Sequence, residues 1–595
     1  MKSSGHRTGR ERWSARPRPN DMRISPCRHA LRHLARGALA VRLFAAMAAG
    51  AQTNFPVEIT VDAGRPLGEF KPIWRMFGAD EPNYATLPEG RKLIGELGAL
   101  QPGQIYFRTH NLLCSGDGTP ALKWGSTGVY TEDASGQPVY HWQILDAIFD
   151  TYLTNGVKPY AQIGFMPEAL STHPEPYQHH WKPGDKYADI ETGWAYPPKD
   201  YERWRELVYQ WTKHCVERYG RAEVQTWYWE VWNEANGSYW KASPAEFYRL
   251  HDYAVDGVRR ALPTARVGGP DVARAGGQWM RHFLEHCLHG TNYATGKIGT
   301  PLDFISFHAK GSPAYTNEHV RLGLANQVRT LDDGFGLIQS YPELQHLPIV
   351  IGESDPDGCA ACQGEQLGYR NTTMYSSYTA ASFARHWELA RQRGVNLDGA
   401  LTWAFTFADQ PPFAGFRQLA TAGIDLPVLN VFRMFSRMHG QQLSVQSDGE
   451  IPLAELKQRG VRGRPDVSAL ASRDQHRFAV LVWHYHDDDV PGPDAAVSLT
   501  LAHFPAAHQP VQLTRYVIDA SHANAFTAWQ KMGAPFPLTP AQFASLEQAG
   551  KLVPLGPPEA ISVNGDSLPL KFSLPRQAVT LLLFDPEPAA ARPAH

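Results

Sequence analysis

The sequence predicts an α/β protein in which a (β/α)8 barrel, or TIM barrel, is followed by a β-sandwich. Eight short apolar runs alternate with helical patterns between about residue 74 and residue 440. After about residue 440 the pattern changes to alternating strands separated by Pro, Gly and Asp. Eight strand–helix units favour a closed barrel over an open sheet, and the later strands favour a sandwich. A chain of 595 residues has room for a catalytic core and an accessory domain.

The first 51 residues differ from the rest of the chain and have the order of a secretory signal. With Met22 as a candidate start, basic residues precede an apolar stretch over 37–49, and small residues at 49–51 offer a cleavage site. The alternative is a disordered basic tail, and Arg42 inside the apolar stretch weakens the signal. We expect a leader over 1–51 and a periplasmic or secreted protein. No other run of about 18 apolar residues occurs, so no membrane span is expected.

Each barrel strand is predicted from one apolar run. An N-terminal segment over 52–66 contains a strand, 57–63, that we expect to pair with the sandwich, and the barrel is expected over 67–440. The eight predicted barrel strands lie in the runs 74–80, 105–110, 157–165, 226–234, 265–272, 303–310, 348–355 and 399–409.

The stretches between these runs are predicted to form helices. Apolar residues recur at helical spacing over 142–152, and Ser243 with Glu246 forms a capping box that begins a helix over 243–258. The sandwich is expected over 441–588, before a tail over 589–595. Thr539, Pro540 and Gln542 predict one helix within it that ends at Gly550. Its clearest strands are the runs 477–486, 496–504, 511–519 and 577–585.

Charge and cysteine content exclude several classes of protein. Lys and Arg total 57 against 59 Asp and Glu, and no basic stripe with aromatic residues appears in the body of the chain, so nucleic acid is not expected as a partner. The motif Cys359-Ala-Ala-Cys362 has no second pair of Cys or His at metal-ligand spacing. It favours a local disulfide or two idle thiols over a redox pair or a zinc site.

Two glutamates at strand ends carry the functional prediction. Glu234 closes the run WYWEVWNE, and Glu353 closes PIVIGE. Active sites of such barrels lie at the carboxyl ends of the strands, and two carboxylic acids there are the minimal equipment for cleaving a glycosidic bond. Glu230 lies on the same face as Glu234 but about 13 Å deeper along the strand, so we assign it a structural role.

These segments also carry a resemblance to a known family. The matching stretches are VKPYAQIGFMPEAL (157–170), EVWNEANGSYW (230–240), DFISFHAKG (303–311), IGES (351–354) and DASHANAFTAWQKMG (519–533). They resemble the retaining glycosidases of clan A and, more closely, glycoside hydrolase family 39, whose known activities centre on β-xylosidase. The segments FMPEAL and WNE are the most specific matches.

The resemblance implies a double-displacement mechanism. Glu353 would be the nucleophile, Glu234 the acid/base, and Asn233 would hold the 2-hydroxyl of the sugar. A retaining enzyme keeps its two carboxyl groups about 5–5.5 Å apart, whereas an inverting one holds them roughly 6.5–9.5 Å apart. We expect ionised Glu353 to raise the pKa of Glu234. No metal and no cofactor are expected.

Further candidates lie at other strand ends. His110 and His308 can each hydrogen-bond a sugar hydroxyl or steady a glutamate, or be structural. Trp403 is expected to form the floor of the sugar site by stacking, with core packing as the alternative. Phe165 and Glu168, after the third strand, are expected to line the pocket.

Two departures from the family limit what the resemblance implies. The eighth-strand region reads WAFTFADQPPFAGF, without the Ser-Asp expected after the tryptophan, and the second strand ends Arg108-Thr109-His110-Asn111 rather than in His-Gly. Such loops set substrate choice, and the loop 356–364 after Glu353 is placed to shape the aglycone side. The resemblance therefore implies a retaining exo-β-xylosidase that acts on xylo-oligosaccharides. An α-L-arabinofuranosidase, another exo-glycosidase of the family, or a non-catalytic carbohydrate-binding barrel are the alternatives.

Overall fold

The structure is a computed structural model that describes residues 53–186, 190–475, 477–505, 510–563 and 565–586. The predicted leader over 1–51, the candidate start Met22 and the tail over 589–595 lie outside these residues. No helix within the described ranges combines the length and apolar character needed to cross a membrane.

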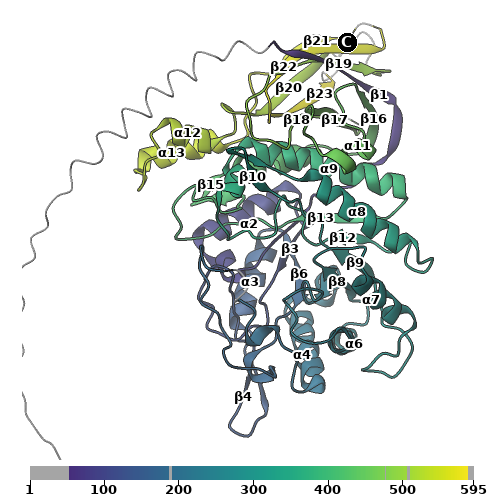
Figure 1. Ribbon diagram of the computed structural model, residues 1–595, viewed down its shortest axis with the longest axis vertical. Coiled ribbons are helices and arrows are strands. Elements are labelled where there is room, and N and C mark those ends of the chain that lie inside the picture. The colour runs from purple at the N-terminus through teal and green to yellow at the C-terminus, as the bar shows by residue number, and fades with distance from the viewer. Residues whose placement is uncertain (1–52, 187–189, 476, 506–509, 564, 587–595) are drawn as a thin grey trace, which may run out of the picture. The chain divides into compact units, whose positions relative to one another are not determined.

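Eight parallel strands form a closed barrel, which confirms the predicted fold class. Each strand falls within one predicted apolar run or overlaps it (Figure 1). In barrel order the strands are β12 (Ile349–Ile351), β13 (Leu397–Thr402), β2 (Met76–Ala79), β3 (Ile105–Thr109), β6 (Val157–Ile163), β7 (Tyr228–Val231), β8 (Arg266–Val272) and β9 (Phe304–Phe307).

A helix follows each of these strands along the chain. Figure 1 shows α3, α4, α6, α7 and α8 outside the strands. The capping box predicted at Ser243 is present and begins α6. The eight helices are α2 (Pro88–Leu100), α3 (Gln143–Thr154), α4 (Tyr201–Tyr219), α6 (Pro244–Ala261), α7 (Gln278–His289), α8 (Leu324–Gln339), α9 (Thr373–Arg393) and α10 (Pro427–Phe435).

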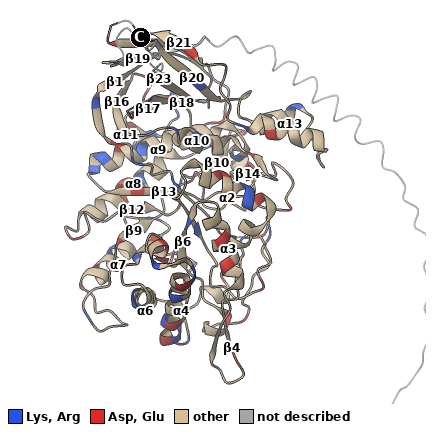
Figure 2. Cartoon of the chain, turned by 180° about the vertical axis from the view of Figure 1, so that it is seen from behind, with Lys and Arg blue, Asp and Glu red and all other residues tan. Residues whose placement is uncertain are grey.

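Shorter elements lie in the connections between the barrel strands and helices. They are the hairpins β4 (Tyr130–Glu132) with β5 (Pro138–Tyr140), β10 (Ala314–Thr316) with β11 (His319–Arg321) and β14 (Ala420–Thr421) with β15 (Ile424–Asp425), and the one-turn helix α5 (Arg221–Val224). Charged residues of both signs alternate along α4 (Figure 2), where Lys213 pairs with Glu217 at 2.6 Å. Such exposed i,i+4 pairs add only a few tenths of a kcal/mol, on the order of 0.3–0.5 each.

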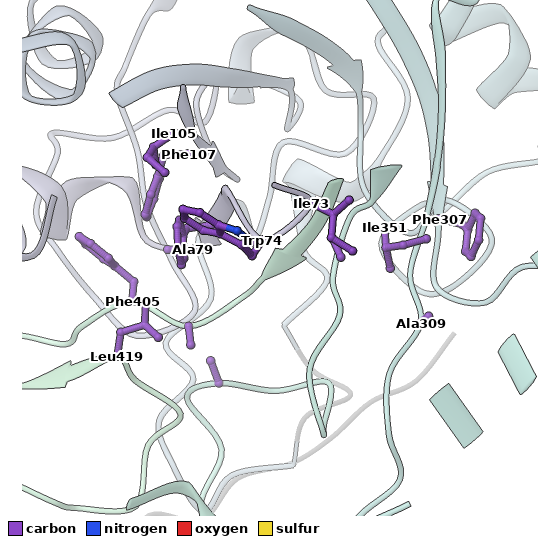
Figure 3. Packing of buried hydrophobic residues seen from close by; sticks show 14 of the residues in the cluster. Ile73, Trp74, Ala79, Ile105, Phe107, Phe307, Ala309, Ile351, Phe405 and Leu419 are labelled. Carbon is purple, nitrogen blue, oxygen red and sulfur yellow. The ribbon is translucent and has the colours of Figure 1, made fainter. Parts of the chain in front are cut away.

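The barrel strands are buried on both faces, as expected for parallel strands covered by helices. Outward side chains such as Ile105, Phe107 and Ile351 pack in the layer between strands and helices (Figure 3). Inward side chains fill the barrel with a separate cluster formed by Met76, Tyr106, Tyr160, Tyr228, Phe304, Val350, Leu401 and Trp403. Strand β8 has a glycine, Gly268, at this level. A larger residue would clash there, because its Cβ would lie 2.4 Å from the carbonyl oxygen of Phe304. The interior is therefore a packed floor on which the site rests.

The C-terminal region is one nine-stranded, mostly antiparallel sheet. It includes the N-terminal strand, because β1 pairs in parallel with β19 and antiparallel with β16. In order the strands are β21 (Glu559–Ser562), β20 (Pro510–Ile518), β23 (Val579–Pro586), β18 (Phe478–Tyr485), β17 (Asp466–Arg473), β16 (Gln441–Ser447), β1 (Phe55–Glu69), β19 (Ala495–Ala502) and β22 (Ser567–Leu574). Apolar residues from all nine strands pack in or against one core, as in a sandwich.

The outer face of this sheet packs on the barrel. Leu481 and Trp483 of β18 belong to the apolar core of the barrel, and Arg385 of α9 donates to Asp466 of β17 at 2.9 Å. For this reason β18 is buried along its whole length rather than on alternate residues. A short helix, α11 (Leu453–Arg459), lies in the connection between β16 and β17.

Two helices, α12 (Ala525–Lys531) and α13 (Pro540–Gly550), interrupt the sheet strands. The capping box predicted at Thr539 is present and begins α13. The sequence prediction missed α12, which is short and begins at the cap Asn524. Phe526 and Trp529 of α12 pack on Phe413 from the loop after β13, with ring centroids 5.5 and 5.1 Å apart. This segment therefore reaches a loop at the carboxyl end of the barrel.

Candidate active site

Glu234 lies three residues beyond β7, at the carboxyl end of the barrel strands. The chain turns there through two left-handed residues, Trp232 with φ 70° and Glu234 with φ 45°. A non-glycine residue in this region is strained and is held by its surroundings. Here the peptide N–H of Glu234 donates to the carbonyl of Asp271 at 3.0 Å. The turn brings the carboxylate to the barrel mouth, where 18% of the side chain is exposed.

Glu353 lies two residues beyond β12, at the same end of the barrel. It follows Gly352, where a Cβ would lie 1.9 Å from Oδ1 of Asp271, so that only glycine fits. The peptide N–H of Ser354 donates to the carbonyl of Leu401 at 2.8 Å and fixes the chain after Glu353 to β13. The Glu353 side chain is only 5% exposed, so it is held more tightly than Glu234.

The two carboxylates face each other across a lysine. Nζ of Lys310 lies 2.7 Å from Oε1 of Glu234 and 2.7 Å from Oε2 of Glu353. One oxygen of each glutamate and a ring nitrogen of His308 all lie within 4.8 Å of one another. The structure therefore brings the two predicted acids into one site and adds a cation that the sequence analysis did not single out.

His308 steadies Glu234. Its Nδ1 lies 2.8 Å from Oε1 of Glu234, and its Nε2 lies 2.7 Å from Oδ2 of Asp271. Burial lowers the pKa of His308, but the charges of Asp271 and Glu353 outweigh burial and raise it to about 9. Of the roles considered for His308, the arrangement supports the contact with a glutamate, because both ring nitrogens are taken.

The expected rise in the pKa of Glu234 is wrong for this arrangement. Burial does act in that direction, but the Lys310 ammonium and the His308 ring hold the pKa of Glu234 well below its usual range. The prediction considered only the like charge of Glu353. It missed two cations because both belong to another strand segment, just past β9.

Arg108 and Glu230 form the deepest polar layer of the site. Nε of Arg108 donates to Oε2 of Glu230 at 2.5 Å, and both side chains are fully buried. Tyr160 and Ser306 also donate to Glu230. Burial raises the pKa of Glu230 to about 7. This environment matches the structural role that depth along the strand predicts for Glu230.

Asn233 is oriented by the same arginine. Nη2 of Arg108 donates to Oδ1 of Asn233 at 3.0 Å. The Asn233 side chain is therefore fixed through its oxygen, and its amide nitrogen remains to donate to a ligand.

His110 and Trp403 lie together beside this layer. Their rings are 4.3 Å apart, and Arg108 lies 5.2 Å from the Trp403 ring. Nδ1 of His110 lies 2.7 Å from Asp80 and its Nε2 lies 3.1 Å from Nη1 of Arg108, so both nitrogens have partners. Trp403 packs over Gly78, where a Cβ would lie 2.5 Å from its ring. Trp403 also belongs to the interior cluster, so it both packs in the core and borders the site.

Phe165 and Glu168 lie in different surroundings in the structure. Phe165 is buried with its ring 5.5 Å from that of His110, so it supports the site from behind. Glu168 is exposed and lines a separate cavity of about 870 Å³, together with Ser115, Thr131 and Lys199. None of the other predicted site residues lines that cavity. Glu168 begins the short helical turn Glu168–Leu170, which follows Pro167.

The residues that the sequence analysis missed are Lys310, Asp271, Arg108, Asp80 and Lys123. Lys310 had a usable signal, because it follows His308 by two residues and so projects to the same side of an extended chain. Lys123 contacts Asp80, which in turn binds His110. These contacts join loops far apart in the sequence, which no local pattern predicts.

The loop after Glu353 is closed by a disulfide between Cys359 and Cys362. This resolves the alternatives for the motif in favour of a local disulfide. Arg370 donates to the carbonyls of Cys359 and Cys362 and to Asp357. Among the described cysteines, Cys114, Cys215 and Cys287 are free and buried.

Comparison with known proteins identifies related sequences. The model of glycosyl hydrolases family 39 matches residues 57–567. The chain is 27% identical over 456 residues to a β-xylosidase from Geobacillus stearothermophilus, which covers 73% of this chain and 77% of that protein. It is 26% identical over 560 residues to α-L-iduronidase from Homo sapiens, which covers 85% of this chain and 75% of that protein.

Solved structures share the fold. A monomeric β-xylosidase from Caulobacter crescentus CB15 superposes with a TM-score of 0.71 at 22% identity, over 89% of this chain and all of that one. A bacterial orthologue of human α-L-iduronidase gives a TM-score of 0.69 at 20% identity, over 90% of this chain and 84% of that one. At these identities the likeness supports the barrel and sandwich architecture.

Proposed function

This chain belongs to family 39 of the glycosyl hydrolases and is a glycosidase, and we propose that it is a retaining exo-β-xylosidase that releases xylose from the non-reducing end of xylo-oligosaccharides. The observation that carries the retaining mechanism is the separation of the carboxylates, with one oxygen of Glu234 and one of Glu353 within 4.8 Å. That distance is close to the about 5–5.5 Å of retaining enzymes and below the roughly 6.5–9.5 Å of inverting ones, so it supports direct attack by a carboxylate. The choice of xylose rests on the β-xylosidases among the relatives.

In the proposed first step, a carboxylate oxygen of Glu353 bonds to the anomeric carbon of the sugar. The bond from that carbon to the leaving oxygen breaks, and Glu234 gives a proton to this oxygen. In the second step, water attacks the same carbon, the ester bond to Glu353 breaks, and Glu234 takes the proton from the water. Two inversions give net retention of configuration.

The proton for the first step is held by His308 in the free enzyme. Glu234 is ionised there because Lys310 and His308 lower its pKa. A glycosidic oxygen beside Glu234 takes the place of Nζ of Lys310, and the loss of that positive charge raises the pKa of Glu234. The proton then moves from Nδ1 of His308 to Oε1 of Glu234 along their 2.8 Å contact. Deglycosylation returns the proton to His308.

Asn233, Trp403 and His110 hold the sugar in this proposal. The free amide nitrogen of Asn233 donates to the 2-hydroxyl, and the Trp403 ring forms the floor by stacking. His110 acts through its ring face and its contact with Trp403, because both of its nitrogens already have partners.

A second candidate function is the hydrolysis of a uronic acid glycoside. Lys310 favours it, because an ammonium group between the two carboxylates can bind a substrate carboxylate once the sugar displaces it from Glu234. The α-L-iduronidases among the relatives act on a substrate of this class by name.

A panel of nitrophenyl glycosides tests the proposal. It should include the β-xylopyranoside, the α-L-arabinofuranoside and an α-L-iduronide, each with the unmutated enzyme, Glu234→Ala and Glu353→Ala. We expect the xyloside to be cleaved best and each mutation to lower its kcat/KM by at least about a hundredfold. Glu168→Ala is the matched control, because this glutamate lines the separate cavity. Full activity in either active-site variant would refute the catalytic assignment, and no hydrolysis of any glycoside would favour a carbohydrate-binding barrel.

A further inference from the structure

A chain of alternating charges runs through the site. It begins with Glu230 at the floor and ends with Glu353 at the mouth. The order is Glu230, Arg108, Asp271, His308, Glu234, Lys310 and Glu353. Each neighbouring pair is in direct contact: Arg108 with Glu230, His308 with Asp271 and Glu234, and Lys310 with both Glu234 and Glu353 lie 2.5–2.8 Å apart, and Arg108 also contacts Asp271. Asp271 lies at the centre of this chain but takes no part in the two steps of the proposed reaction.

Asp271 is built into both catalytic segments. Its φ is 48°, which is a left-handed conformation that a non-glycine residue adopts only when its surroundings hold it. Its carbonyl accepts the peptide N–H of Glu234, and the next residue, Val272, accepts the peptide N–H of His308 at 2.8 Å. Its carboxylate packs on Gly352, the residue before Glu353. The backbone therefore fixes Asp271 between the strand ends that carry both glutamates.

The contacts of His308 require both of its ring nitrogens to donate. Nδ1 faces Glu234 and Nε2 faces Asp271, and both partners are carboxylates that only accept while they are ionised. A neutral imidazole has one N–H, so it would leave one carboxylate without a donor. The groups that face the ring are Asp271, Glu234, Glu353 and Lys310. Three of the four are anionic, which favours the charged ring.

Resting on the proposed function, we propose that Asp271 is a positioning residue that keeps the His308 ring doubly protonated and turned toward Glu234. In the free enzyme the pair of His308 and Glu234 then contains the one proton that the acid step needs. Asp271 touches neither the sugar nor the reacting atoms. It acts through the imidazole, and it would set the upper pH limit at which the enzyme can still protonate a leaving group.

The substitution Asp271→Asn removes the charge and keeps the shape. Oδ2 of Asp271 accepts from both His308 and Arg108, while its Oδ1 has no hydrogen-bond partner among the described residues. An asparagine can therefore keep its oxygen toward the two donors and place its amide nitrogen at the unpartnered position. The matched control is Asp252→Asn, because Asp252 is also fully buried and binds a histidine, His286, at 3.0 Å, but lies on α6 away from the site.

The dependence of kcat/KM on the leaving group distinguishes a positioning role of Asp271 from a general loss of activity. Kcat/KM should be measured for a dinitrophenyl glycoside, whose departure needs no proton, and for the phenyl glycoside of the same sugar, using whichever sugar the unmutated enzyme cleaves. We expect Asp271→Asn to reduce kcat/KM at least about tenfold more for the phenyl glycoside than for the dinitrophenyl one. We also expect its alkaline limb for the phenyl glycoside to move about one to three pH units lower. Asp252→Asn should show neither change.

Other outcomes would overturn the proposal. Equal losses on both glycosides in Asp271→Asn, or no shift of its alkaline limb, would mean that Asp271 is merely structural. Glu234→Ala measured alongside separates this from the proposed function: if it too lacks leaving-group dependence, the acid role of Glu234 is wrong and the proposal falls with it.

A second measurement needs no variant of Asp271 and covers the case in which that variant does not fold. Nitrogen-15 NMR of the histidine-labelled, unmutated enzyme, with His308→Gln used to assign the signal, reports the protonation of each ring nitrogen. We expect both nitrogens of His308 to be protonated at about pH 7.5, one unit above the ordinary pKa of histidine. A neutral ring at that pH would overturn the proposal.

Discussion

Arg108 binds Glu230 at the floor of the site through a 2.5 Å contact between Nε and Oε2, and neither side chain has any exposed surface. This pair holds Glu230 within β7, whereas Glu234, four residues later, lies beyond the end of the strand. Glu230 holds Arg108, and Arg108 in turn orients Asn233 and contacts Asp271. Glu234 lies past the strand end, where its side chain is partly exposed and contacts His308 and Lys310.

Removing Glu230 should therefore destabilise the protein rather than remove a reacting group. Glu230→Ala leaves a buried guanidinium with one carboxylate fewer, and breaking such a pair costs about 3–5 kcal/mol. Urea unfolding measures this loss, with Glu168→Ala as an exposed control that should stay within about 0.5 kcal/mol of the unmutated protein. A loss below about 1 kcal/mol for Glu230→Ala would show that the buried pair contributes little to stability.

Lys310→Met should distinguish the two candidate substrates. The change keeps the aliphatic length and removes the charge between Glu234 and Glu353. A neutral xyloside loses no partner, so its KM should change less than about threefold, whereas a uronide loses a charged hydrogen bond worth about 1.5–3 kcal/mol. Steady-state kinetics on both substrates measures the difference. A large rise in the xyloside KM would mean that Lys310 binds the neutral sugar directly.

Trp403→Ala should weaken binding of the sugar. Loss of the stacking face is expected to raise KM about tenfold, equivalent to about 1.4 kcal/mol, and Trp403→Phe should recover part of the loss. Trp483→Ala is the control for general destabilisation, since that tryptophan is similarly buried but lies on β18, where the sheet packs on the barrel. If Trp403→Ala lowers only the melting temperature, as the control should, then Trp403 is a core residue alone.

Glu81 should make stability fall as pH rises. Burial and the charge of Asp80 raise its pKa to about 8 in the folded protein, and its Oε1 accepts the peptide N–H of Lys123 at 2.6 Å. The folded state therefore binds a proton that the unfolded state releases above about pH 4.5, so stability is lost as pH rises from there through about 8. Glu81→Gln should flatten the dependence of melting temperature on pH across this window. An unchanged slope would assign that dependence to other groups.

Much of the fold could be predicted because the barrel strands are buried on both faces. Such strands appear in the sequence as short continuous apolar runs, and all eight were found in this way. The alternating pattern over 477–486 predicts a strand with one exposed face. Strand β18 is buried on both faces, because the barrel covers the second one. Helix α12 escaped prediction because a segment of seven residues gives too short a periodic signal. The leader and export stay predictions.

The site was predictable where strand ends determine it. Glu234, Glu353, Asn233 and His308 each come within three residues of a strand end, so the barrel geometry gathers them. Glu168, also expected to line the pocket, lies on a cavity that none of the other predicted site residues lines. The low pKa of Glu234 could not be foreseen, since it depends on the charge of Lys310, which only tertiary structure brings to 2.7 Å.

The proposed reaction assigns the attack on the sugar to Glu353 and the proton transfer to Glu234. Adding azide to Glu353→Ala and to Glu234→Ala and determining the anomeric configuration of each glycosyl azide by proton NMR tests it most directly. We predict that Glu353→Ala is rescued with inverted configuration, because azide replaces the missing nucleophile. Glu234→Ala should give the retained product, because azide attacks the covalent intermediate on Glu353. The opposite assignment of configurations, or inverted sugar released by the unmutated enzyme, would contradict the account.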